Sequence, residues 1–301
     1  MPTSSAAARP AMSFLSPLPV FFVLLWSTGF IVAKFGLPYA PPLTFLLLRF
    51  IGVLLILVPL VLLLKAPWPS GRQTRHIAIA GVLLQAGYLS GVWAAIKLGM
   101  PAGLSALIVG MQPILTAFAA PLLGERVRPV QWLGLLFGLG GVALVVAAKV
   151  HLVGLSPGSI ALSVMALLSI TAGTLYQKRY CPHFDLRTGT AIQFTASLLV
   201  LMPAAIWFED WTPAFAAVAW TPRFVGALLW SVLVLSIGAI FLLFVLIRRS
   251  NATQVTSLLY LTPPTTAVMA WLMFGEAFNL MGVAGMLLAV IGVMFVVRKS
   301  N

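Results

Sequence analysis

The sequence predicts an all-α polytopic membrane protein, with ten transmembrane helices arranged as two five-helix inverted repeats around a central cavity. Three observations lead to this prediction: an apolar composition, a series of apolar runs of membrane length, and a stretch that the chain repeats. Of the 301 residues, 61% are hydrophobic and 8% are charged, and the mean hydropathy is +1.08. Most of the chain is therefore expected to lie in a membrane.

The apolar runs are each about 20 residues long, which is enough to cross a hydrocarbon core about 30 Å thick. Helices are predicted because backbone N–H and C=O groups in lipid must be satisfied within the segment, and the alternation of a barrel strand is absent. The predicted helices cover residues 18–37, 43–64, 76–97, 101–121, 129–148, 158–178, 188–208, 223–247, 252–272 and 279–298.

Proline and glycine mark the connections between these runs. The breakers are Pro41-Pro42, Pro67 to Gly71, Gly99 to Pro101, Pro157-Gly158, Pro182 and Pro213. Before the first run the only charge is Arg9, and no short apolar region with a cleavage site precedes it, so the first helix is expected to direct insertion.

The stretch from Leu104 to Val146 recurs as Val255 to Val297 at a fixed offset of 151 residues. The matches at this offset include Pro113 with Pro264, Gly124-Glu125 with Gly275-Glu276, Gly134 with Gly285, and Gly141-Val142 with Gly292-Val293. We therefore predict a duplication into the halves 1–150 and 151–301. Because each half has five helices, the halves enter the membrane from opposite sides, as suits a protein that presents one site alternately to both sides.

The distribution of Lys and Arg predicts the orientation. Thirteen of these residues fall on one side of the membrane: Arg9, Lys65, Arg72, Arg75, Arg126, Arg128, Lys178, Arg179, Arg187, Arg248, Arg249, Arg298 and Lys299. Four fall on the other side: Lys34, Lys97, Lys149 and Arg223. Both termini are therefore predicted to be cytoplasmic.

Several motifs together resemble one family. They are LLWSTGFIVAKFG in the first predicted helix, LLLRF in the second, GMPAGLSALIVGMQPILTAFAAPLLGER through the fourth, and GLLFGLGGVALVV and GMLLAVIGVMFVV in the fifth and tenth. The chain resembles the drug/metabolite transporter superfamily and, within it, the EamA-type exporters. The resemblance implies a cavity lined mainly by helices 1, 3, 4, 6, 8 and 9 with helices 5 and 10 at the periphery. It also implies export of amino acids, aromatic or otherwise neutral, or of other small metabolites across the cell (inner) membrane.

The acidic residues bear on the mechanism, because a proton relay needs an ionisable group at membrane depth. All five acids fall at turns or helix ends: Glu125, Asp185, Glu209, Asp210 and Glu276. The histidines His76, His151 and His183 lie at connections as well. Facilitated transport is therefore expected, while proton-coupled efflux through Glu125 or Glu276, coupling to another ion, and phosphate-ester or nucleotide-sugar exchange stay open.

The same shortage of groups argues against an enzyme, which needs a nucleophile, a base or metal ligands within reach of one another. A membrane receptor is the alternative from another class, although a receptor gives no reason for an inverted duplication. No cofactor or metal is predicted, since Cys181 is the single cysteine. The expected partners are a small-molecule substrate and the lipid bilayer but no nucleic acid, because the basic residues are dispersed, and a monomer is favoured.

Polar and aromatic residues inside otherwise apolar helices are the candidates for substrate binding. They are Trp26, Gln85, Tyr88, Trp93, Gln112, Tyr176 and Tyr260. Gln85, Tyr88, Leu89, Val92 and Trp93 share one helical face. Interfacial anchoring of Trp and Tyr, and hydrogen bonding of Gln between helices, are the alternatives. Such a wall suits an apolar or aromatic substrate.

Two further sets of residues are predicted to control conformation. Pro113 and Pro264 are candidate hinges, with a static bend as the alternative. Glu125 is expected to pair with Lys178 or Arg179, and Glu276 with Lys34 or Arg49, so that each pair steadies a closed gate. Arg49 is the one basic residue clearly inside a span, and snorkelling or structural pairing is favoured for it over substrate binding. Gly134-x-x-x-Gly138 and Gly285-x-x-x-Ala289 predict close helix packing within the bundle.

Overall fold

The computed structural model describes residues 17–100, 105, 108–147, 156–210, 215–274 and 280–297. Within these ranges all regular elements are helices and no strand occurs, which confirms the predicted all-α class. Five helices of the described chain are long and apolar enough to span a membrane: Pro42–Leu63, Gly71–Lys97, Pro157–Tyr180, Leu186–Glu209 and Pro222–Arg249. Shorter apolar helices cover Pro17–Gly29, Gln112–Leu123, Pro129–Val145 and Leu280–Val296.

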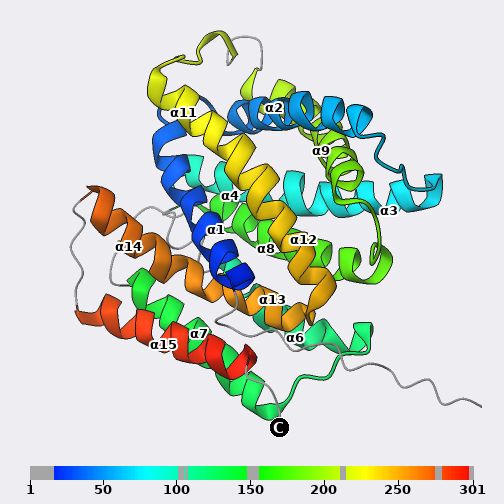
Figure 1. The fold of residues 1–301 in the computed structure, drawn as a ribbon. Helices are drawn as coiled ribbons and strands as arrows, with labels where there is room; N and C mark the ends of the chain where they lie inside the picture. The colour runs from blue at the N-terminus through cyan, green and yellow to red at the C-terminus, as the bar shows by residue number, and fades with distance from the viewer. Residues whose placement is uncertain are drawn as a thin grey trace, which may run out of the picture.

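The helices of the first half follow the predicted runs closely (Figure 1). They are α1 (Pro17–Gly36), α2 (Pro42–Leu63), α3 (Gly71–Gly81) continued by the π-helix η1 (Val82–Gly87) and by α4 (Tyr88–Lys97), α6 (Gln112–Ala119) with the 3-10 helix η2 (Ala120–Leu123), and α7 (Pro129–Ala147). α3 begins before the apolar run predicted from residue 76, because Ser70 Oγ accepts a hydrogen bond from Gln73 N and caps a polar first turn.

The second half repeats this pattern of elements. It contains α8 (Pro157–Tyr180), α9 (Leu186–Glu209), α11 (Pro222–Trp230) continued by the π-helix η3 (Ser231–Ala239) and by α12 (Ile240–Arg249), α13 (Ala252–Ser257) with the 3-10 helix η4 (Leu258–Leu261) and α14 (Thr262–Phe274), and α15 (Leu280–Val297). At the offset of 151, residues 82–87 of η1 fall on 233–238, inside η3. The two halves therefore have a π-helix at equivalent positions, in addition to the residues that match at this offset.

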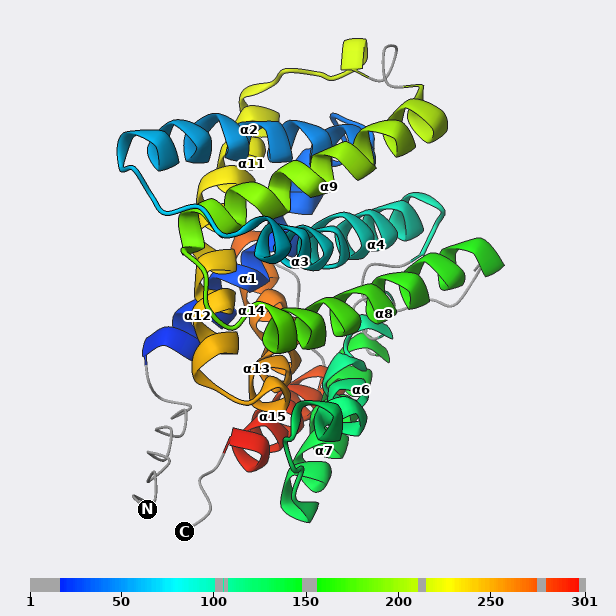
Figure 2. The same ribbon diagram turned by 90° about the vertical axis from the view of Figure 1, so that its right-hand side faces the viewer.

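Two helix pairs form opposite edges of the molecule (Figure 2). α2 packs on α9 at one edge, where Phe50 meets Phe194 edge-on with 5.1 Å between ring centroids. α7 packs on α15 at the other edge, and the remaining helices lie between the two pairs. The fifth and tenth helices are thus peripheral, as the resemblance implies.

Two acidic residues mark the two ends of the helix bundle. At the Glu209 end, where α9 finishes, the Glu209 carboxylate accepts hydrogen bonds from Leu43 N and Thr44 N at the start of α2. At the Glu125 end, the Glu125 carboxylate accepts a hydrogen bond from Ala252 N at the start of α13. α2 therefore begins at the end where α9, its counterpart in the second half, finishes, and the two helices run antiparallel.

Glycines allow α7 and α15 to pack backbone against backbone. A Cβ atom placed on Gly141 would lie 2.4 Å from Ala289 N, and one on Gly292 would lie 2.3 Å from Gly138 N. Contacts this short exclude any side chain at either position unless the helices separate. The predicted patterns pack as closely, since a Cβ atom on Gly134 would lie 2.6 Å from Gly292 O and one on Gly285 would lie 2.7 Å from Gly141 O.

Candidate functional site

A cavity of about 70 Å³ lies between α1, α2, the η1 and α4 segment, and the η3 and α12 segment. Its walls are formed by Trp26, Gly29, Arg49, Leu84, Gln85, Tyr88, Leu89, Val92, Trp93, Ile96, Leu235 and Ile240. A space of about 40 Å³ adjoins it, because both share Trp26, Tyr88 and Val92 as walls. The second space is completed by Ser105, Val109, Gly110, Leu259, Thr262 and Pro263. We call the two spaces together the central cavity.

Four of the seven predicted substrate-binding residues line the central cavity: Trp26, Gln85, Tyr88 and Trp93. The whole predicted face of the third helix, including Leu89 and Val92, faces it as well. Trp93 also stacks on Phe45 of α2, with 5.1 Å between ring centroids, which fixes the orientation of its indole. The structure therefore brings together the aromatic and amide groups that the sequence suggested, and their role in binding stays a prediction.

The other three predicted residues lie elsewhere. Gln112 donates from Nε2 to Thr174 Oγ1 at 3.1 Å and links α6 to α8. Tyr176 lies near the Glu125 end, where its hydroxyl is 2.7 Å from His76 Nδ1 and its ring contacts Tyr180. Tyr260 is fully buried against Gly138 of α7. Gln112 thus makes the interhelical hydrogen bond that was the alternative for it, whereas Tyr260 packs in the hydrophobic core.

Both π-helices border the central cavity. Gln85 belongs to η1 and Leu235 to η3. A π-helical turn shifts the backbone hydrogen-bond register, and such turns occur frequently at functional sites. Ser236, which stands at the offset of 151 from Gln85, donates from Oγ to Ser231 O at 2.9 Å. Each wide turn thus carries a polar side chain at the equivalent position of the repeat, and helical periodicity alone does not reveal the wide turns.

Arg49 extends from α2 into the wall of the central cavity. Arg49 is 6% exposed, and its Nε donates a hydrogen bond to Ser236 Oγ at 2.7 Å. No carboxylate in the described ranges pairs with it. The side chain therefore lies along the cavity wall and hydrogen-bonds across to η3, and the expected snorkelling or structural pairing stays a prediction. Glu276, its predicted partner, and the side chain of Lys34 lie outside what the structure describes.

The predicted partner of Glu125 is in place. Lys178 Nζ lies 3.6 Å from Glu125 Oε1, and Lys178 also donates to Ile247 O at 2.9 Å. Sequence reasoning missed the part played by Glu209, whose side chain is 4% exposed and whose Oε2 also accepts from Thr44 Oγ1 at 2.9 Å. The signal available in the sequence was weak, since an acid at the end of an apolar run more often faces water.

The two candidate hinge prolines lie where their helices are interrupted. Pro113 is the second residue of α6 and follows a turn at Gly110 and Met111, and Pro264 is the third residue of α14 and follows η4. Pro113 thus follows a turn, whereas Pro264 follows a 3-10 segment from which α14 continues directly; both prolines stand in the first turn of an α-helical segment, where proline is tolerated. Whether these two irregularities act as hinges stays a prediction.

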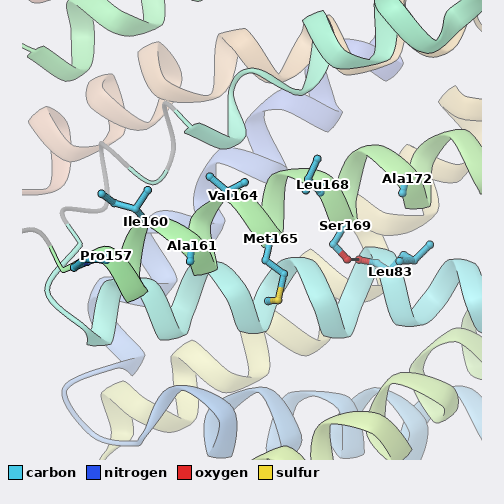
Figure 3. Close-up of a pocket in the computed structure, with 9 residues that line it drawn as sticks. All are labelled: Leu83, Pro157, Ile160, Ala161, Val164, Met165, Leu168, Ser169 and Ala172. Carbon is cyan, nitrogen blue, oxygen red and sulfur yellow. Dashed lines mark hydrogen bonds between the residues drawn. The ribbon is translucent and has the colours of Figure 1, made fainter.

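Another hollow, of about 860 Å³, is a groove on the outside of α8 (Figure 3). It is lined mainly by apolar side chains such as Ile160, Val164 and Leu168. Its one hydroxyl, on Ser169, already donates to Leu83 O at 2.9 Å. An apolar groove on the exposed side of a spanning helix suits lipid chains, so the smaller central cavity is the better candidate site.

Antiparallel spanning helices with two equivalent interruptions around a buried, partly polar cavity are typical of a multi-pass membrane transporter. The chain belongs to the EamA-like transporter family, whose sequence model matches residues 17–147 and 157–298. It is 30% identical to the uncharacterized transporter YvbV of Bacillus subtilis, over 94% of this chain and 92% of that protein. It is 27% identical to the uncharacterized inner membrane transporter YedA of Escherichia coli, over 89% of this chain and 87% of that protein.

Two more distant similarities concern an efflux pump and a solved structure. A probable amino-acid metabolite efflux pump of Salmonella typhimurium is 26% identical over 62% of this chain and 60% of that protein. A crystal structure at 19% identity superposes with a TM-score of 0.75, covering 92% of this chain and 94% of the other. At that identity the superposition supports the fold alone.

Proposed function

We propose that this transporter exports amino acids with aromatic or other neutral side chains, or related small metabolites, across the cell inner membrane by alternating access. The observation that carries this proposal is the composition of the central cavity. Trp26, Tyr88 and Trp93 offer aromatic surface, and Gln85 offers an amide donor and acceptor. Aromatic walls with a few oriented polar groups are typical of sites for an amphipathic small molecule.

Names of similar proteins point the same way. Besides the efflux pump above, a probable terminal-alkyne amino-acid exporter of Streptantibioticus cattleyicolor is 24% identical over 77% of this chain. Both names concern amino acids or their metabolites, and both concern outward movement.

Facilitated transport is the mechanism that the described residues favour. No acidic or histidine side chain of the described chain lines the central cavity, and a proton relay needs such a group at membrane depth. The test is uptake of labelled phenylalanine, leucine and lysine into proteoliposomes, with and without an uncoupler. We expect saturable phenylalanine uptake that survives collapse of the proton gradient. Uptake that requires the gradient would favour proton-coupled efflux instead, and uptake of no amino acid would refute the substrate class.

The halves 1–150 and 151–301 are proposed to be inverted repeats, with the Glu125 end facing the cytoplasm. The antiparallel course of α2 and α9, the shared positions of η1 and η3, and the excess of Lys and Arg on one side support this proposal. Single cysteines introduced beside Glu125 and Glu276, in a Cys181→Ser background, should react with an impermeant maleimide from opposite sides of the membrane. Reaction from the same side would exclude the inverted arrangement.

A further inference from the structure

The central cavity holds a buried cation that has no anionic partner among the described residues. Arg49 lies in the apolar sequence LLLRFIGVLL of α2, lines the cavity, and is 6% exposed. Its single hydrogen bond in the described chain runs from Nε to Ser236 Oγ, so the two terminal guanidinium nitrogens have no protein acceptor there. Of the acids in the described ranges, Glu125, Asp185, Glu209 and Asp210, each lies at a helix end or in a connection.

An unpaired guanidinium at this depth is costly, because desolvation of a charge is compensated only by an opposite charge or by hydrogen bonds. The planar fork of Arg matches a carboxylate through two parallel N–H donors. With Nε already bonded to Ser236, the terminal nitrogens, which no described residue accepts from, are available to a ligand. Ser236 Oγ in turn donates to Ser231 O within η3, so the π-helix holds the guanidinium in a fixed orientation.

We propose that Arg49 binds the carboxylate of the transported substrate, with Ser236 as its positioning residue. The inference rests on the proposed transport function and adds the charged group that the substrate must carry. The aromatic side chains Trp26, Tyr88 and Trp93 share the same small cavity and would contact the body of the ligand. Binding of a monocarboxylate neutralises the cavity, whereas an amine without a carboxylate adds a second positive charge.

The test compares three probes with the same aromatic body: 3-phenylpropionate, phenylalanine and phenylalaninamide. Their binding to the purified full-length protein in lipid nanodiscs is measured by isothermal titration calorimetry. For the unaltered protein we expect the two carboxylates to bind roughly tenfold or more tightly than the amide, since a charge-assisted hydrogen bond is of that strength. Arg49→Gln should remove this preference, and Arg49→Lys, which keeps the charge without the fork, should retain only part of it.

Arg249→Gln is the matched control, because Arg249 is exposed at the end of α12, and it should leave the preference unchanged. If Arg49→Gln fails to fold, as judged by thermal unfolding, Ser236→Ala decides the matter. Ser236→Ala keeps the charge of Arg49 but removes the hydrogen bond that orients its guanidinium. It should therefore weaken binding of 3-phenylpropionate and phenylalanine and leave binding of phenylalaninamide unchanged.

Loss of affinity for all three probes in equal measure would show that Arg49 is structural and would overturn the inference, as would a lack of binding by both carboxylates to the unaltered protein. Arg49-dependent binding of 3-phenylpropionate without uptake of any amino acid would refute the proposed substrate class and leave the carboxylate site standing. Amino-acid uptake together with an unchanged preference for carboxylates in Arg49→Gln would refute the carboxylate site and leave the proposed substrate class standing.

Discussion

Lys178 Nζ lies 3.6 Å from Glu125 Oε1, with both side chains largely buried at 12% and 13% exposure. The same carboxylate accepts a hydrogen bond from Ala252 N at 3.0 Å, and Lys178 reaches the carbonyl oxygens of Ile247 and Ser250 at the end of α12. One ion pair therefore links the connection after η2 to α8, α12 and α13 at the Glu125 end of the bundle, and its role as a gate stays a prediction.

Glu125→Gln is expected to open the Glu125 end. Removing one partner of a partly buried pair should shift the equilibrium by about 1–3 kcal/mol, which is a factor of roughly 5 to 150 in population. The measurement is the reaction rate of Val92→Cys, in a Cys181→Ser background, with an impermeant maleimide applied from the Glu125 side. Lys178→Gln should have the same effect, and Glu276→Gln should raise access from the opposite side.

Arg126→Gln serves as the control, since Arg126 is exposed beside Glu125. Unchanged access in both Glu125→Gln and Lys178→Gln would mean that the pair shapes the turn without gating the cavity.

Glu209→Gln is expected to lower the free energy of unfolding by about 1–3 kcal/mol, because hydrogen bonds to a buried carboxylate are stronger than those to an amide. Lys97, although 3.8 Å away, is 52% exposed, so Lys97→Gln should have a much smaller effect. Thermal unfolding in detergent measures both, with the exposed neighbour Asp210→Asn as control. Equal losses from Glu209→Gln and Lys97→Gln would show that the ion pair, and not the cap of α2, provides the stability.

Gly141→Ala and Gly292→Ala are each expected to destabilise the α7 and α15 pair by about 1–3 kcal/mol through overpacking. The clashing atoms belong to the backbone, so no side chain can move aside to relieve them. Gly140→Ala is the matched control, because its Cβ would meet only Leu288 Cδ2 at 3.6 Å and alanine favours the helix. Equal stability of all three variants in thermal unfolding would argue that the two helices separate easily.

Cys181 is expected to react slowly with maleimide at neutral pH. It is 2% exposed, and burial raises the pKa of its thiol to about 11, in spite of the opposing charge of Arg248. Because the raised pKa favours the neutral thiol, the reactive thiolate is scarce at pH 7. As long as the pH is below the pKa, the labelling rate should rise about tenfold for each unit by which the pH is raised. Arg72→Cys, at an exposed position in a Cys181→Ser background, should label rapidly at pH 7. Equally rapid labelling of native Cys181 would contradict its burial.

The sequence by itself determined the helices, their order and the repeat. Apolar length, proline and glycine act locally, so the predicted run 43–64 appears as Pro42–Leu63 and 188–208 as Leu186–Glu209. The face of the third helix was also predictable, because Gln85, Tyr88 and Trp93 recur at helical spacing. The glycine patterns of the fifth and tenth helices indicated close helix packing, but they did not indicate that α7 and α15 pack against each other.

Only the tertiary structure decided where Arg49, Gln112, Tyr176, Tyr260 and Glu209 point. In a membrane protein both the lipid and the packed interior are apolar, so the hydrophobic pattern of a helix does not distinguish the side that faces a cavity from the side that faces lipid. The contact between Arg49 and Ser236, 187 residues apart, depends on the packing of α2 against η3. The contact of Glu209 with Leu43 and Thr44 likewise depends on the end of one helix meeting the start of another, and no local pattern specifies such a meeting.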